Sequence, residues 1–167
     1  MALRKKIVDL AKMVGGIPGM IFKIDENAPE YYALDCVVTD EMADVALSMG
    51  LRKKRTAAEV AKRCGKSLEA TRELLHEMAQ IGVVKVWTED GSDMYMVQIF
   101  APGMLEMMVN NKEQLKKYPQ IGKAFEEYTR IRIAELATNL PMGTSPMRVI
   151  PVEAAIDGNM KTVPYEQ

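Results

Sequence analysis

A helix, a tight turn and a second helix between residues 56 and 81 constrain the fold of this chain more than any other feature. Thr56 is followed three residues later by Glu59, the spacing of a capping box, in which each side chain satisfies a backbone N–H of the first helical turn. Gly65 ends the predicted short helix, and Ser67 is a natural N-cap for the longer helix that follows. The buried stripe expected on the longer helix is Thr71, Leu74, Leu75, Met78 and Ile81. The segment therefore predicts a helix-turn-helix.

Two strands are predicted directly after this motif. Residues 83–87 and 94–100 are rich in Val, Met and aromatic side chains, and Asp90 with Gly91 favours a hairpin turn between them. A short helix, a tight turn, a longer helix and a hairpin, in this order, are typical of a winged helix-turn-helix.

Further helices are predicted on both sides of the motif. Apolar positions at helical spacing indicate helices over 3–14 and 39–50, and two more beginning at Pro102 and near Pro119. The last helix is expected to carry an apolar stripe of Ile121, Phe125, Tyr128 and Ile131. The two C-terminal helices are expected to cover the open side of the winged domain.

The predicted fold class is mainly α with a small β-hairpin: a winged helix-turn-helix with additional N- and C-terminal helices and an extended C-terminal tail. The predicted regions are an N-terminal helix and connecting segment (1–38), the winged helix-turn-helix (39–100), C-terminal helices (101–140) and an extended tail (141–167) that links to a missing domain. Four prolines in this last region exclude a long helix there.

The composition excludes several classes of function. The 22 Lys and Arg against 23 Asp and Glu give a net charge of -1, which argues against non-specific coating of nucleic acid. The one histidine, His76, and the two cysteines, Cys36 and Cys64, form no spacing that would build a zinc site or a catalytic triad. We therefore expect no enzyme activity and no cofactor or metal held by this chain. No apolar run is long enough to predict a membrane span, and we expect a cytoplasmic protein.

Two partial motifs do not support other chemistry. Gly65-Lys66-Ser67 matches the end of a phosphate-binding loop, but Val60 occupies the required glycine position and a helix precedes the loop. His76-Glu77 resembles the start of a zinc-protease helix, but Gln80 stands at the second ligand position. We expect His76 to be a surface residue.

The expected DNA-contacting elements are acidic. The solvent face of the second motif helix consists of Glu69, Ala70, Arg72, Glu73, His76, Glu77 and Gln80, three acids against one arginine. The hairpin tip over 88–93 carries three acids and no base, whereas elements that touch DNA usually present Arg, Lys, Asn or Gln. If DNA is bound, the candidate residues are Arg52, Lys53, Lys54, Arg55, Lys66 and Arg72; a solvated loop explains the run 52–55 equally well.

Two family resemblances follow from particular segments. Residues 56–84 resemble the winged-helix modules of bacterial and archaeal regulators and the N-terminal dimerisation domain of small-molecule O-methyltransferases. The flanking segments resemble the N-terminal part of 4Fe-4S ferredoxin-type proteins of anaerobic bacteria and archaea. The segments that carry this second resemblance are Pro29-Glu-Tyr-Tyr-Ala-Leu, Thr39-Asp-Glu, Phe100-Ala-Pro-Gly-Met, Ala124-Phe-Glu-Glu-Tyr, Met147-Arg-Val-Ile-Pro-Val-Glu-Ala-Ala-Ile and Val163-Pro-Tyr-Glu.

The ferredoxin resemblance implies a role in electron transfer for the whole protein. In that family the Pro-Tyr-Glu segment leads into a cysteine-rich half that holds the 4Fe-4S clusters, so clusters are implied for a half that is missing here. Cys36 and Cys64 cannot supply the closely spaced thiolates that a cluster needs.

The leading hypothesis is a non-catalytic winged-helix module for protein interaction or dimerisation in such an electron-transfer protein. Its partner would be its own cluster-bearing domain, a redox partner or a second copy; nucleic acid is less favoured, and no membrane is expected. The alternating tail positions Met147, Val149, Ile150 and Val152 are the candidate docking residues. The alternatives are a DNA-binding winged-helix transcriptional regulator and the dimerisation domain of an O-methyltransferase-like protein.

Overall fold

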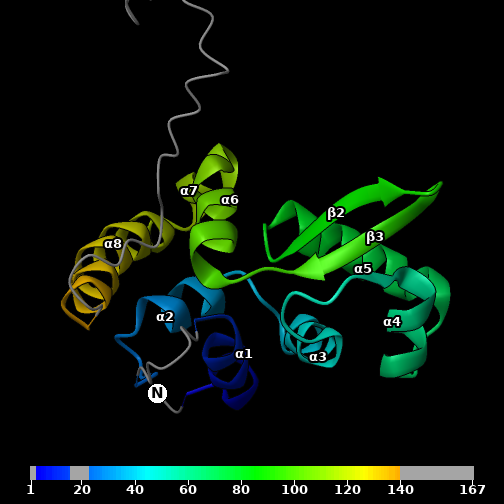
Figure 1. Cartoon of the computed structure of the whole chain (residues 1–167), viewed down its shortest axis with the longest axis horizontal. Coiled ribbons are helices and arrows are strands. Elements are labelled where there is room, and N and C mark those ends of the chain that lie inside the picture. The colour runs from blue at the N-terminus through cyan, green and yellow to red at the C-terminus, as the bar shows by residue number, and fades with distance from the viewer. Residues whose placement is uncertain (1–2, 16–22, 140–167) are drawn as a thin grey trace, which may run out of the picture.

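The computed structural model describes residues 3–15 and 23–139 of the chain. In this part, eight α-helices accompany one three-stranded antiparallel sheet (Figure 1). The predicted fold class, mainly helical with a small sheet, is confirmed.

The order of the central elements is that of a winged helix. They are α3 (Asp40–Met49), β1 (Arg55–Thr56), α4 (Ala57–Cys64), α5 (Leu68–Gln80), β2 (Val84–Glu89) and β3 (Ser92–Val97). The sheet order is β1-β3-β2, so the strand before the motif pairs with the second strand of the hairpin. The two-residue strand β1 was not predicted from the sequence.

Local capping explains why α4 and α5 begin and end where they do. Glu59 N donates to Thr56 Oγ1 (3.3 Å) and Thr56 N donates to Glu59 Oε2 (2.7 Å), which closes the predicted capping box. Gly65 ends α4 in the left-handed conformation (φ 65°), which glycine adopts without a steric penalty. Ser67 Oγ accepts the N–H of Ala70 at the start of α5 (3.2 Å). These predictions are confirmed.

The hairpin is a regular ladder closed by a two-residue turn. Its last pair is Glu89 with Ser92. The two turn residues, Asp90 (φ 52°) and Gly91 (φ 75°), both have positive φ, as a two-residue type I′ hairpin turn requires. The predicted second strand extended too far, because β3 ends at Val97. Phe100 belongs to the helical core instead.

Two helices were not predicted from the sequence, and the predicted start of a third helix at Pro102 was wrong. The helices outside the winged unit are α1 (Lys5–Gly15), α2 (Pro29–Asp35), α6 (Leu105–Asn110), α7 (Lys112–Lys117) and α8 (Gln120–Asn139), of which α2 and α7 were not predicted. Pro102 does not begin a helix, because residues 101–103 have non-helical backbone angles.

The apolar stripe predicted on α8 is only partly correct. Ile121 and Tyr128 are buried, but the side chains of Phe125 and Ile131 are 40% and 41% exposed. Ala124 and Arg132 of this helix are buried as well.

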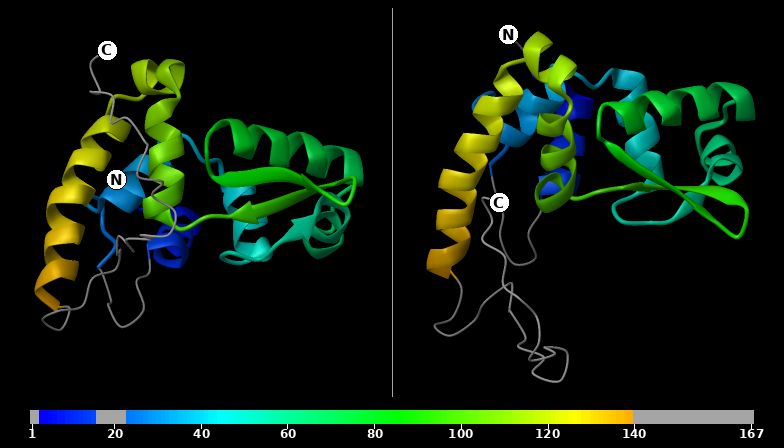
Figure 2. Two further views of the ribbon diagram at one scale, coloured as in Figure 1. Left: turned by 45° about the horizontal axis from the view of Figure 1, so that its top comes forward. Right: turned by 90° about the horizontal axis from the view of Figure 1, so that it is seen from above.

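The C-terminal helices lie beside the winged helix and do not cover its sheet, contrary to the prediction (Figures 1 and 2). Asn111 Nδ2 donates to the carbonyl of Gln80 (3.2 Å) and Gln114 Nε2 donates to that of Ile81 (3.3 Å). The region around α7 therefore satisfies backbone acceptors at the C-terminal end of α5. One face of the sheet packs on α5, and no described helix covers the other face.

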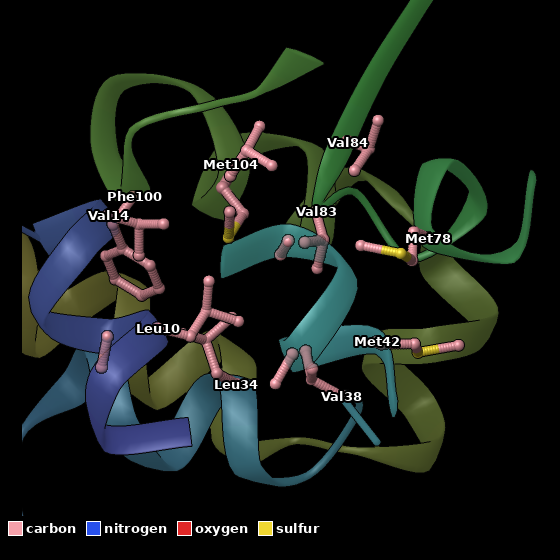
Figure 3. Packing of buried hydrophobic residues seen from close by; sticks show 14 of the residues in the cluster. Leu10, Val14, Leu34, Val38, Met42, Met78, Val83, Val84, Phe100 and Met104 are labelled. Atoms are coloured by element: carbon pink, nitrogen blue, oxygen red, sulfur yellow. The ribbon is translucent and has the colours of Figure 1, made fainter. Parts of the chain in front are cut away.

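A single hydrophobic core joins the three predicted regions that fall within the described residues. Figure 3 shows Leu10, Leu34 and Phe100, from three different segments, directed into the same space. The Phe100 and Tyr128 rings pack with their centroids 5.2 Å apart, which ties α8 to this core. The tail over 141–167 lies outside the described residues.

Candidate functional site

A cleft opens between α5, the N-terminus of α4 and the hairpin. Its lining residues are Thr56, Ala57, Ala58, Arg72, Glu73, His76, Gly91, Ser92, Asp93 and Tyr95. Asp93 and Tyr95 reach it from the same face of β3 because side chains two apart in a strand share a face. Arg72, Glu73 and His76 come from one side of α5, as helical spacing requires.

The exposed face of α5 is acidic, as the sequence indicated. Glu69, Glu73 and Glu77 are all exposed and follow each other at one-turn spacing, with Arg72 exposed beside them. His76 is also exposed, with Nε2 3.1 Å from Gln80 Nε2, so its prediction as a surface residue is confirmed.

Several basic candidates for DNA contact are engaged within the protein. Lys54 Nζ lies 3.0 Å from both carboxylate oxygens of Glu89 on the hairpin and 5.7 Å from the Trp87 ring centre. The hydrogen bond from Lys54, with a second one from Trp87 Nε1, holds the pKa of Glu89 below its ordinary value. The charge of Lys54 is thus balanced by an acid of the wing.

Arg55 and Lys66 are also held by internal partners. Arg55 Nε donates to the carbonyl of Met49 (2.8 Å) at the end of α3. Lys66 forms an ion pair with Glu41, and this hydrogen bond raises the pKa of the lysine. Arg52 and Lys53 are exposed.

Of the six DNA-contact candidates, Arg72 lines the cleft. It faces a mixed environment there, because Glu73 and Asp93 line the same cleft. Burial and then the charge of Asp93 raise the pKa of Tyr95, and the nearby Arg72 charge partly opposes that shift. The cleft therefore carries charged side chains of both signs.

Tyr95 and Asp93 were not identified as site residues from the sequence. The alternation of side chains along β3 could have placed both on one face of the strand. It could not have shown that this face lies across the cleft from Arg72, because that depends on the orientation of the hairpin relative to α5. The tail candidates Met147, Val149, Ile150 and Val152 lie outside the described residues.

The cysteines do not fit an iron–sulfur cluster. Cys36 Sγ donates to the carbonyl of Ala33 (3.0 Å), and Cys64 Sγ lies 3.0 Å from Ser48 Oγ. A 4Fe-4S cluster takes four cysteine thiolates, and the chain has two cysteines. Within the part of the chain that the structure describes, no three His, Cys, Asp or Glu side chains gather in a way that could hold a metal ion.

None of the described helices combines the length and the apolar character needed to cross a membrane.

Comparisons with known proteins give little further information. No family model and no curated protein sequence matches the chain. Among solved structures, HlyU from Vibrio cholerae N16961 is similar over 57% of this chain and 98% of its own, with 18% sequence identity and a TM-score of 0.37. A likeness at this score supports neither a fold nor a function, and the winged helix rests on the element and strand order described above.

Proposed function

We propose that this chain is a non-catalytic docking module whose winged helix binds a polypeptide at the cleft between α5 and the hairpin. The observation that carries the proposal is electrostatic. The two elements that a DNA duplex would meet, α5 and the hairpin tip, present exposed carboxylates, and three nearby basic side chains are already engaged. Carboxylates brought against phosphates lose hydration beside like charge.

The cleft itself has the properties of a peptide site. It offers hydrogen-bonding groups and charges of both signs. Arg72 stands on one wall and Asp93 on another, beside the ring of Tyr95. A polypeptide can match such a mixed surface with its own side chains and backbone, whereas a uniformly anionic duplex cannot.

We further propose that the partner is the cluster-bearing half of a 4Fe-4S ferredoxin-type protein. This part of the proposal is supported by the resemblance of the flanking segments, above all Met147–Ile156 and Val163-Pro-Tyr-Glu. The module would position that half and would take no part in electron transfer through its own residues.

The proposal is tested by two titrations of the full chain. Fluorescence anisotropy with a labelled DNA duplex at low salt is expected to show no association. Calorimetry with a separately produced ferredoxin-type cluster half is expected to show binding, which the double variant Glu73→Lys/Asp93→Lys weakens. Glu113→Lys, which reverses an exposed acid on α7 outside the cleft, is the matched control and is expected to bind normally.

A DNA-binding regulator is the second candidate. It is favoured by the position of α5, whose outer face is exposed in the place where this fold carries its recognition helix, and by Arg72, Arg52 and Lys53 on the surface. This candidate predicts duplex binding that weakens steeply with added salt and that Arg72→Ala makes less selective. Such a result would overturn peptide docking at the cleft.

A further inference from the structure

The outer margin of the sheet is an open strand edge. In the order β1-β3-β2, β2 has a strand on one side only. Figure 1 shows β2 along the margin of the sheet with α5 behind it. Among the described residues, no hydrogen bond reaches the backbone of 84–89 other than those from β3.

The register of the sheet fixes which backbone groups face this open edge. The carbonyl of Val97 accepts the N–H of Arg52, on the side of the sheet away from β2. Because the backbone groups of one strand residue point the same way and alternate along the strand, Val97 does not hydrogen-bond its partner Val84. The N–H and C=O of Val84, and by the same alternation those of Val86 and Thr88, are therefore directed outward. The side chain of Val86, 45% exposed, lies at this edge.

The side chains of β2 are self-complementary in charge. Lys85 and Glu89 stand at equal distances in sequence on either side of Trp87, and all three share the face of the sheet that α5 does not cover. We propose that β2 pairs antiparallel with β2 of a second copy of this chain, about a two-fold axis at Trp87. In this register Val86 exchanges backbone hydrogen bonds with Thr88 of the second copy. Lys85 then lies opposite Glu89 of the second copy, and the two Trp87 rings form a non-hydrogen-bonded cross-strand pair.

The length of the free edge agrees with this register. Pairing about Trp87 brings Asp90 of the second copy opposite Val84, so the partner's turn falls where the edge ends. Just before Val84, the Gly82 backbone packs so closely on α6 that a Cβ there would lie 3.0 Å from Met107 Cβ. Pairing of the two β2 strands joins the two three-stranded sheets into one continuous six-stranded sheet. Because each copy contributes one short strand, the contact is smaller than a standard interface and the dimer is reversible.

Sedimentation of the full chain over a range from low micromolar to millimolar concentration tests the proposal. We expect a monomer–dimer equilibrium together with a concentration-dependent exciton signal from Trp87, the one tryptophan of the chain. Val86→Pro removes an outward N–H without removing a ladder hydrogen bond, so it is expected to abolish dimerisation while the circular dichroism of the monomer is retained. A chain that stays monomeric at millimolar concentration, or a dimer that Val86→Pro leaves intact, overturns the proposal.

Charge reversal supplies a test that misfolding cannot imitate. Lys85→Glu and Glu89→Lys each place like charges opposite one another, and each is expected to weaken self-association by about tenfold or more. Glu89→Lys also breaks the ion pair of Glu89 with Lys54 of its own chain, whereas Lys85→Glu leaves that pair intact. An equimolar mixture of the two variants restores opposite charges at both positions and is expected to form a heterodimer that is tighter than the homodimer of either variant. A mixture that associates no better than either variant contradicts the register. Neither measurement involves the cleft or a cluster-bearing partner. A failure of the proposed β2 pairing is therefore distinguishable from a failure of the docking proposal.

Discussion

Arg132 on α8 and Glu30 on α2 form an ion pair in the interior, with Nε 3.0 Å from Oε1 and Nη2 3.3 Å from Oε2. The Glu30 side chain is fully buried, and that of Arg132 is 11% exposed. Two parallel hydrogen bonds fix the relative position of the two helices, and the Tyr32 hydroxyl of α2 adds a hydrogen bond to Glu127 Oε2 of α8 (2.9 Å). Gly15 completes this site, because a Cβ there would lie 3.0 Å from Glu30 Cγ.

Removing the arginine is expected to be costly. Arg132→Met leaves the Glu30 carboxylate buried without its guanidinium partner, and we expect the free energy of unfolding to fall by about 3–5 kcal/mol. The double variant Glu30→Gln/Arg132→Met removes both charges and is expected to recover a large part of that loss. Urea denaturation monitored by circular dichroism measures both. A single variant that is as stable as the double variant would show that the ion pair has no such role.

The capping box of α4 gives a smaller and pH-dependent contribution. Thr56→Ala removes the side-chain acceptor for Glu59 N and is expected to lower stability by about 1 kcal/mol, whereas Thr56→Ser, which keeps the hydroxyl, is expected to be near neutral.

The hydrogen bond from Thr56 N holds the pKa of Glu59 below its ordinary value of 4.5. The stability that this carboxylate supplies is therefore complete above that ordinary value and is lost as the pH falls through the lowered pKa. Glu59→Gln keeps the acceptor but cannot titrate. We expect the stability difference between the wild type and this variant to change only in this acidic range; a difference that changes near neutral pH would contradict the assignment.

The elements that were predicted from sequence are those with signals inside a few residues. Thr56 with Glu59, Gly65, and Ser67 mark the ends of α4 and α5 without reference to the rest of the chain. In contrast, α2 begins without a side-chain cap and has seven residues, and its buried face is defined by contact with α1 and α8. The strand β1 is two residues long and exists through pairing with β3.

The candidate site divides in the same way. Helical spacing alone placed Glu73 and Arg72 on the outer face of α5. Neither spacing nor composition shows that Lys54 is paired with Glu89, 35 residues away, or that Phe100 leaves the hairpin to pack on Tyr128. Long-range pairing decides how much positive charge a surface keeps, so the sequence indicated the acids of the site better than it indicated the availability of its bases.

Two glycines with positive φ are expected to respond differently to alanine. At Gly65 (φ 65°) no atom lies within 4 Å of an added Cβ, so Gly65→Ala is expected to cost only the backbone strain, about 1 kcal/mol. At Gly82 (φ 88°) an added Cβ would also lie 3.1 Å from the backbone nitrogen of Met108, which cannot move without shifting α6. Gly82→Ala is expected to cost about 2–4 kcal/mol in urea denaturation. Equal losses for the two variants would show that α6 yields easily at this contact.

The thiol of Cys36 is expected to become reactive only at a higher pH than an ordinary cysteine, because it is partly buried. Burial raises the pKa of this thiol from 9.0 to about 11, so the thiolate fraction at pH 8 is about a hundredfold below that of an unperturbed cysteine. In the variant Cys64→Ser, which leaves one thiol in the chain, the rate of modification by a disulfide reagent should keep rising about tenfold per pH unit beyond pH 9. The same variant unfolded in guanidinium is the reference and should level off near pH 9, because its thiol is solvated. Simple steric protection would slow the folded protein equally at every pH, so a folded-state profile parallel to the unfolded one would contradict the raised pKa.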